Sequence, residues 1–267
     1  MPTPVQANRW DFPSSDKLEF APKNRDYAVC IPAMNEGDHF LRQIGLMTEL
    51  VIQKIADIII LDGNSTDGST EPELLSNEVR SILVNSSDEK GLGADYRMGF
   101  AYAMKEGYRG VITIDGNGKD NPSSIPDFIN ELENGWDFIQ GSRFVEHGNA
   151  INTPLSRELA IRFIHRPLIS LGARFLYTDT TNGFRGHSRR LIRDPKMNIF
   201  RNVFKSYELL AYISVMASRV GLRVKEIPVM RGYPDNREIP TKIVGVKAKL
   251  KILIGVIKVI AGSYSPE

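Results

Sequence analysis

The 267-residue sequence contains a single cysteine, Cys30, so no disulfide can form within the chain. A chain without disulfides fits a reducing compartment. Lysine and arginine exceed aspartate and glutamate by only two charges, whereas domains that bind nucleic acid usually carry a clear basic excess. We therefore expect no nucleic acid among the partners of this protein.

Long apolar runs are absent as well. No stretch reaches the roughly 18 uninterrupted apolar residues of a membrane-spanning helix, and residues 1–17 contain no apolar segment of the kind found in secretory signals. The sequence also has no internal repeat and no low-complexity tract. We expect a cytoplasmic protein that could meet a membrane only peripherally, on the cytosolic face.

What the chain does contain, from residue 27 onward, is an alternation of short apolar runs and amphipathic segments. The apolar runs predict strands at 27–32, 56–61, 81–84, 110–115, 136–144 and 222–229. Apolar side chains at three- and four-residue spacings predict helices at 38–55, 92–107 and 122–134, and over most of 151–195 with a break at 178–186. Such alternation predicts an α/β fold with a mainly parallel central sheet flanked by helices.

The two ends of the chain differ from this pattern. We expect the polar, proline-bearing residues 1–25 to cover the surface of a single catalytic domain at 26–240, followed by a tail at 241–267. Residues 241–262 hold five lysines and no acidic residue, which predicts a basic amphipathic helix suited to an anionic membrane surface. The alternative is a helix packed on the domain with its lysines in water. Residues 163–177 likewise predict either a second interfacial helix or part of the core.

The most informative motif follows the apolar run that ends at Asp115. Asn117 lies two positions further on, and strand residues two apart point to the same side. Carboxylate and amide oxygens are ligands for hard cations such as Mg²⁺ or Mn²⁺. Asp115 and Asn117 could therefore bind a divalent metal, although an ordinary polar turn would use the same residue types.

Polar segments also follow two other predicted strands, at 31–37 and 61–68. The carboxyl ends of parallel strands share one edge of a sheet, where ligands of open α/β folds bind. Asp62 at that edge could accept a hydrogen bond from a ribose hydroxyl or a base N–H. A Rossmann fold would need G-x-G-x-x-G after the first strand, where the sequence reads PAMNEG; the glycines Gly91 and Gly93 follow a later strand and could meet phosphate or cap a helix.

Taken together, six motifs in order, IPAMNE, LDGNSTDGS, KGLGADYRMGFAYA, IDGNGKDNPSSIP, GSRF and DTTNGFRG, resemble those of family 2 glycosyltransferases with the GT-A fold. Within that family the chain looks like the polyprenyl- or dolichyl-phosphate sugar synthases. The resemblance covers roughly residues 26–245. It implies a nucleotide-diphosphate sugar as donor and a divalent metal, Mg or Mn, as cofactor.

The resemblance implies that the donor site includes the following residues: Pro32, Glu36, Asp62, Lys90, Gly93 and Asp115. Asp115 and Asn117 stand where the family has Asp-x-Asp, the site of the metal and the diphosphate. Asn117 keeps an oxygen ligand but loses a charge, so we expect weaker metal affinity. Asp120 could supply a compensating carboxylate.

On the acceptor side, the resemblance matches Arg143 to an arginine that contacts phosphate, and Arg157 and Arg185 to arginines near the acceptor phosphate. Asp179 would act in catalysis with Asp115, Asn117 and Arg143, or it would brace its loop.

A later basic element aligns less firmly. It matches Lys242 to a lysine of the family, with either Arg231 or Arg237 as the partner arginine for the acceptor phosphate.

The implied reaction moves a hexose to a polyprenyl phosphate. A phosphate acceptor is already anionic, whereas a sugar hydroxyl would need a carboxylate base, and the sequence identifies no such base firmly. Two alternatives stay open: transfer to a growing surface polysaccharide or lipid-linked saccharide, and a nucleotide-sugar-binding protein without turnover, which Asn117 motivates. The tail or a separate membrane-protein partner would bring the enzyme to a lipid acceptor.

Overall fold

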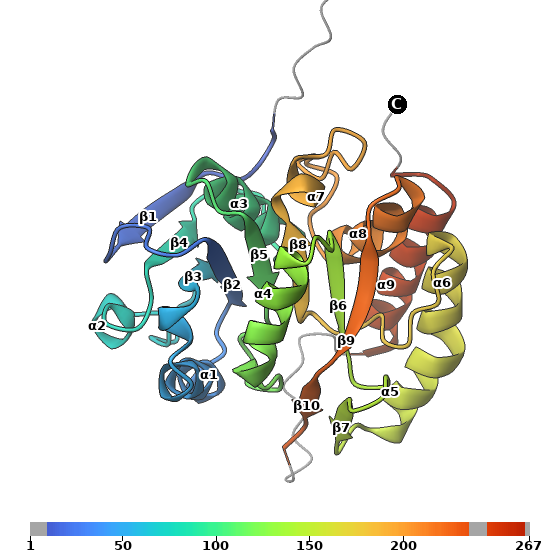
Figure 1. Ribbon diagram of the computed structural model, residues 1–267, viewed down its shortest axis with the longest axis horizontal. Coiled ribbons are helices and arrows are strands. Elements are labelled where there is room, and N and C mark those ends of the chain that lie inside the picture. The colour runs from blue at the N-terminus through green and yellow to red at the C-terminus, as the bar shows by residue number, and fades with distance from the viewer. Residues whose placement is uncertain (1–9, 235–244, 265–267) are drawn as a thin grey trace, which may run out of the picture.

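The structure, a computed structural model, describes residues 10–234 and 245–264. Its centre is an eight-stranded sheet in the order β1-β4-β3-β2-β5-β8-β6-β9 (Figure 1). The strands are β1 Ser15–Glu19, β2 Tyr27–Ala33, β3 Asp57–Asp62, β4 Ser81–Asn85, β5 Gly110–Thr113, β6 Phe138–Ser142, β8 Arg185–Ser188 and β9 Val224–Pro228. Only β1 and β8 run antiparallel to their neighbours in this sheet. The predicted α/β class with a mainly parallel sheet is confirmed.

Each predicted strand is present, but the sequence pattern missed β1 and β8. Strand β1 has the sequence SDKLE and is largely exposed, because it pairs only with the edge strand β4. Residues 15–19, part of the segment that we expected to cover the surface, therefore belong to the sheet. Strand β8 has the sequence RGHS and lies between β5 and β6 without any apolar run of its own.

A second, two-stranded sheet pairs β7 Asn149–Ile151 with β10 Met230–Gly232 in parallel. It lies below the central sheet in Figure 1, beside the start of α5. The sequence pattern had not predicted either strand. The pairing matters for function because it fixes Arg231, the middle residue of β10, beside the loop that follows β5.

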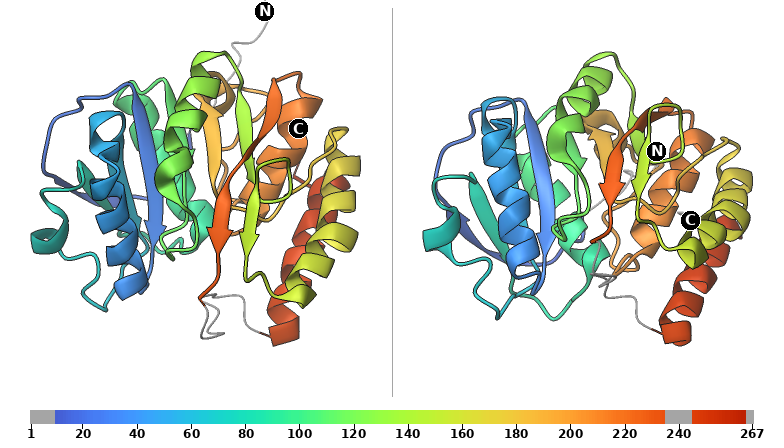
Figure 2. Two further views of the ribbon diagram at one scale, coloured as in Figure 1. Left: turned by 60° about the horizontal axis from the view of Figure 1, so that its bottom comes forward. Right: turned by 90° about the horizontal axis from the view of Figure 1, so that it is seen from below.

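Helices cover both faces of the central sheet (Figures 1 and 2). The longer ones are α1 Asp38–Glu49, α3 Leu92–Lys105, α4 Ile125–Glu133, α8 Glu208–Arg219 and α9 Gly245–Ile260. The shorter ones are η1 Ile52–Lys54, α2 Pro72–Leu75, η2 Pro122–Ser124, α5 Leu155–Ala160, the π-helical η3 Ile161–His165, α6 Arg166–Ala173 and α7 Arg189–Arg193. The sequence pattern had not predicted α2 or α8.

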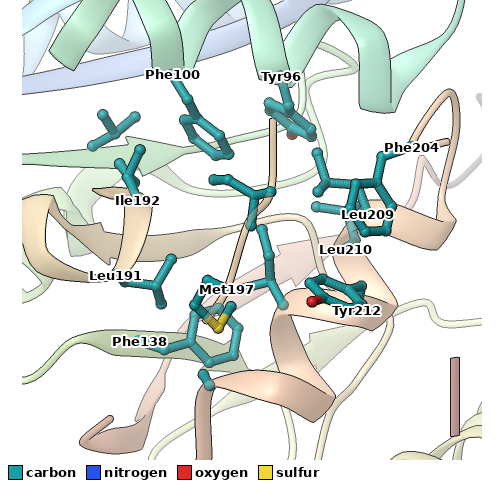
Figure 3. Packing of buried hydrophobic residues seen from close by; sticks show 14 of the residues in the cluster. Tyr96, Phe100, Phe138, Leu191, Ile192, Met197, Phe204, Leu209, Leu210 and Tyr212 are labelled. Carbon is teal, nitrogen blue, oxygen red and sulfur yellow. The ribbon is translucent and has the colours of Figure 1, made fainter. Parts of the chain in front are cut away.

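Alternating residues of β2 point into two separate cores. Cys30 packs with α3 and α8 on one face, while Val29 and Ile31 pack with α1 and α4 on the other. Figure 3 shows the first core, where Tyr96 and Phe100 of α3 face side chains of α7 and α8. A strand buried on both faces reads as a continuous apolar run, which explains why β2, β3 and β5 were predictable.

No helix within the described residues is long and apolar enough to cross a membrane.

Candidate active site

The loops that follow β2 and β3 are joined at the carboxyl edge of the sheet. Asn35, in the left-handed region with φ 51°, receives Thr66 N–H at 2.7 Å on its Oδ1, and its own N–H donates to Ser65 Oγ at 3.1 Å. Gly37 N–H donates to Asp67 Oδ2 at 2.8 Å, so Asp67 shapes this loop. The two polar segments therefore form one surface rather than two independent turns.

Asp62 ends β3 and points into its own loop. Its Oδ1 accepts from Ser65 N at 2.9 Å and from Ser65 Oγ at 2.7 Å, and its Oδ2 accepts from Thr70 Oγ1 at 3.2 Å. Pro32 lies in the neighbouring strand β2, and Glu36 is half-buried in the loop after it. The structure brings the predicted nucleoside residues together, and their contact with a nucleoside stays a prediction.

Gly91 and Gly93, at the start of α3, allow a close approach of the chain to residues 204–206. A Cβ at Gly93 would lie 2.6 Å from Ser206 O, and one at Gly91 would lie 2.6 Å from Lys205 O. Gly93 N–H donates to Lys205 O at 3.1 Å. This arrangement favours a packing role for Gly93 over the predicted phosphate contact. Lys90 is exposed and donates to Asn85 O at 2.7 Å, so its contact with donor stays a prediction.

A buried cluster of charges lies directly beyond β5. Arg231 of β10 donates through Nη2 to Asp115 Oδ2 at 2.9 Å, and its Nη1 forms an ion pair with Asp120 and a 3.2 Å contact with Asn182 Oδ1. Burial by itself would raise the pKa of the Asp115 carboxyl, but the positive charges of Arg231 and Lys119 outweigh it and lower that pKa. Asp115 is therefore ionised at neutral pH.

Space around Asp115 is limited by the segment before β8. A Cβ added at Gly183 would lie only 2.3 Å from Asp115 Oδ1, closer than non-bonded atoms can approach. Glycine at 183 thus allows the loop after β5 and the start of β8 to meet. This requirement explains one of the glycines in the DTTNGFRG motif.

Lys119 lies in the loop that follows β5 and was not among the predicted site residues. Its side chain is buried, with its Nζ 5.5 Å from the centroid of the Tyr233 ring. Arg157 approaches the same tyrosine, donating from Nη1 to the hydroxyl at 2.5 Å. Burial, with help from the nearby Arg231, lowers the pKa of Lys119 to about 8. A lysine two positions after Asn117 is the signal from which sequence reasoning could have found it.

Arg143 and Asp179 form a buried, two-pronged ion pair. Arg143 Nε lies 2.6 Å from Asp179 Oδ2, and Nη2 lies 2.9 Å from Oδ1 and 3.0 Å from Thr181 Oγ1. Burial would raise the pKa of Asp179, yet the Arg143 charge lowers it overall. A catalytic base needs an oxygen that can reach the acceptor, so this geometry favours the alternative in which Asp179 braces its loop. Phosphate contact by Arg143 stays a prediction.

The contact of Arg185 with the acceptor phosphate stays a prediction. Its side chain is buried within β8, and its guanidinium donates to the backbone carbonyls of Asn182 at 2.9 Å, Leu210 at 2.8 Å and Thr180 at 3.3 Å. These bonds tie β8 to α8 and to the preceding loop. These three bonds to backbone carbonyls favour a structural role for Arg185.

Of the later basic element, Arg237 and Lys242 lie outside the described residues. The other candidate arginine, Arg231, is at the centre of the charge cluster. Its position was settled by the β7–β10 pairing, which the sequence pattern did not predict.

The residues beyond β5 fit a divalent cation only as part of a cation–diphosphate unit. Asn117 Nδ2 lies 3.4 Å from Asp115 Oδ2, so the two side chains are adjacent. Within residues 10–234 and 245–264, no group of three or more His, Cys, Asp or Glu side chains is arranged to hold a metal. Mg²⁺ is commonly bound by one or two carboxylates together with substrate phosphates. Asp115 and Asn117 would be its protein ligands.

Comparison with known proteins adds three findings. Residues 28–201 match the family model described as Glycosyl transferase family 2. The undecaprenyl-phosphate mannosyltransferase of Micrococcus luteus is 26% identical over 203 residues, covering 74% of this chain and 80% of that protein. The polyprenol monophosphomannose synthase of Mycolicibacterium smegmatis is 25% identical over 231 residues, covering 84% of each.

Among solved structures, the glucosyl-3-phosphoglycerate synthase of Mycobacterium tuberculosis in complex with Mn²⁺, UDP and phosphoglyceric acid aligns with a TM-score of 0.63. The alignment covers 90% of this chain and 79% of that one at 16% sequence identity. At this low sequence identity, the structural similarity shows a shared fold and nothing more.

Proposed function

We infer the reaction from the premise that the chain belongs to glycosyl transferase family 2, as its motifs predicted. The protein is therefore a glycosyltransferase with the GT-A fold. We propose that it transfers a hexose from a nucleotide-diphosphate sugar to a polyprenyl phosphate, a dolichyl-type lipid. Both substrates of this reaction carry phosphate, so the site must accommodate negative charge on the donor and on the acceptor.

One observation carries the proposal: basic side chains from separate segments converge at the carboxyl edge of the sheet. Lys119 and Arg157 lie at the ring of Tyr233, and Arg231 binds the carboxylate of Asp115. Guanidinium groups bind phosphate oxygens through paired, charge-assisted hydrogen bonds. A site of this composition suits a diphosphate and a second phosphate better than a neutral sugar acceptor.

The state of Asp179 supports a phosphate acceptor. A sugar hydroxyl must lose its proton to a base, whereas a phosphate oxygen is already anionic. Asp179, which was only a candidate for that task, is buried and bound on both oxygens by Arg143. The curated relatives named above act on undecaprenyl phosphate or polyprenol by their names, which agrees with a lipid phosphate acceptor.

We propose a divalent cation, Mg or Mn, as cofactor. Bound with the donor, it would neutralise charge on the diphosphate as the sugar leaves. Asp115 and Asn117 would hold it, and the structural neighbour described above was crystallised with Mn²⁺ and UDP.

We propose a peripheral position on the cytosolic face of a membrane, and an exposed apolar stripe along α5, η3 and α6 supports the membrane contact. Leu155, Leu159, Phe163 and Leu171 form the stripe and are 69%, 46%, 73% and 77% exposed. They are spaced by multiples of four, and the π-helical η3, with more residues per turn than an α-helix, helps keep that spacing on one side. Large apolar residues gathered on a surface mark interaction sites.

Helix α9 lies against α6 and extends this surface (Figures 1 and 2). It exposes Leu250, Ile254 and Ile257 together with Lys247, Lys251 and Lys258. Apolar side chains beside lysines suit an anionic lipid surface. The part of the predicted tail helix that precedes residue 245 lies outside the described residues.

Calorimetry with UDP-glucose, UDP-galactose, UDP-N-acetylglucosamine and GDP-mannose tests the donor half of the proposal. We expect one donor to bind in Mn²⁺, and we expect Asp115→Ala to lose the metal-dependent part of that binding. Binding without any turnover on lipid or saccharide acceptors would favour the non-catalytic alternative, and failure of all four donors would contradict the proposal.

A further inference from the structure

Lys119 is held in a defined place, unlike the solvated lysines of most protein surfaces. Its backbone carbonyl accepts from Gly232 N–H at 2.8 Å, which ties the loop after β5 to β10. Its side chain is only 6% exposed and lies over Tyr233. Lysine is rarely buried unless a charged partner compensates it. The nearby carboxylates of Asp115 and Asp120 raise the pKa of Lys119 against the effect of burial, and its place at the substrate edge of the sheet suits it to meet an anionic ligand.

The balance of charges around this lysine is unusual for a site that relies on a metal alone. Arg231 is bound to both Asp115 and Asp120, which leaves one negative charge in excess. Lys119 and Arg157, which meet at Tyr233, add two positive charges. Asn117, the other side chain beside Asp115, is neutral. A diphosphate arriving next to Asp115 would thus meet a net positive set of protein groups.

We propose that Lys119 is a ligand of the donor diphosphate and neutralises part of the charge that would otherwise require a divalent cation. A nucleoside diphosphate then binds this protein in the absence of metal, and metal strengthens the binding only modestly. Lysine suits this task because its ammonium is a compact point charge. The inference rests on the proposed function, which supplies the diphosphate.

The test is calorimetric binding of UDP and of GDP, each in Mn²⁺ and in EDTA, to the full chain and to Lys119→Gln. We expect the wild-type protein to bind one of the two nucleotides in EDTA within about tenfold of its affinity in Mn²⁺. Lys119→Gln should weaken binding in EDTA by about 10- to 100-fold, the loss of one charge-assisted contact, and should weaken binding in Mn²⁺ much less.

Lys54→Gln is the matched control. Lys54 is exposed in η1, which precedes β3 and so lies away from the carboxyl edge of that strand. The Lys54→Gln substitution removes the same charge as Lys119→Gln, so it separates a local effect from a change in net charge. Thermal unfolding of each variant shows whether Lys119→Gln keeps its fold, and the wild-type comparison decides the central point even if that variant does not fold.

The outcomes separate the inference from the proposed function. Wild-type binding that needs Mn²⁺ overturns the inference and leaves the proposed function standing. Equal binding of wild type and Lys119→Gln in EDTA overturns the role of Lys119. No binding of UDP or GDP under either condition contradicts the proposed function itself.

Discussion

The two halves of the site are held together in different ways. On the β2–β3 side, the loops are joined by hydrogen bonds among short polar side chains and backbone, such as Asn35 to Ser65 and Gly37 to Asp67. On the β8–β10 side, buried arginines hold the segments, with Arg143 on Asp179 and Arg231 on Asp115 and Asp120. Hydrogen bonds of short polar side chains hold the loops of the first half in place, whereas buried ion pairs hold the segments of the second half.

This difference has an energetic consequence. Removing the uncharged partner of a single hydrogen bond near the surface costs little, while removing one partner of a buried ion pair leaves an uncompensated charge. The β8–β10 half should therefore respond to single substitutions far more strongly than the β2–β3 half.

The largest effect is expected for Arg231→Met, which leaves Asp120 buried without its counter-charge. We expect it to lower the free energy of unfolding by about 3–5 kcal/mol, measured by urea denaturation. Arg109→Met is the control: Arg109 and Asp26 form an exposed pair at 3.5 Å, which should contribute at most about 1 kcal/mol. Equal losses in the two variants would contradict the distinction between the halves.

A smaller effect is expected for Gly183→Ala, because the new methyl group would collide with Asp115 Oδ1. Overpacking of this kind typically costs about 1–3 kcal/mol, and displacement of Asp115 should also weaken metal-dependent donor binding. Gly45→Ala is the matched control, since a Cβ at Gly45 in α1 meets nothing within 4 Å. If Gly183→Ala binds donor as wild type does, the close approach to Asp115 is unimportant for the site.

A pH dependence should come from His187 of β8. Burial, with the nearby Arg185, lowers its pKa to about 3, from an ordinary value of 6.5. Between those values the unfolded chain binds a proton that the folded chain does not, so stability should fall as pH decreases below 6.5.

The contribution of His187 to the slope of the free energy of unfolding against pH approaches about 1.4 kcal/mol per pH unit well below pH 6.5. His187→Phe, which keeps an aromatic ring between Phe100 and Phe138, should reduce the slope between pH 6.5 and 5, as measured by denaturation at several pH values. His147→Gln, at an exposed position, should leave the slope unchanged. An unaltered slope in His187→Phe would show that other groups cause the acid sensitivity.

The smallest effect is expected on the β2–β3 side, for Ser65→Ala. Ser65 Oγ accepts from Asn35 N–H and donates to Asp62, so its loss removes a link between the two loops. We expect a cost of about 1 kcal/mol and a modest loss of donor affinity. A cost as large as that of Arg231→Met would refute the proposed difference between the two halves.

The same difference explains how much the sequence could predict. Strands β2, β3 and β5 are buried on both faces and appear as apolar runs, so the edge that carries Asp62, Asp115 and Asn117 was predictable. Strand β8 has no such run, because its buried side chains, Arg185 and His187, are polar.

The charge pairs were harder still to predict. Arg231 meets Asp115 across 116 positions of the chain, and no local pattern reports which of two nearby arginines will do so. Lys119 was missed because a lysine in a polar turn is usually solvated, and only the fold shows that it lies under Tyr233. The family motifs supplied Arg185 and Asp179 as candidates, but only the fold shows that Arg185 binds backbone carbonyls and that Asp179 is paired with Arg143.

We propose that this site transfers a hexose to a lipid phosphate. The most direct measurement is mass spectrometry of the products formed from the bound donor and a short-chain polyprenyl phosphate, with no sugar acceptor present. We predict a hexosyl polyprenyl phosphate with the wild-type protein and none with Asp115→Ala. Product that forms only when a saccharide acceptor is added would contradict the claim.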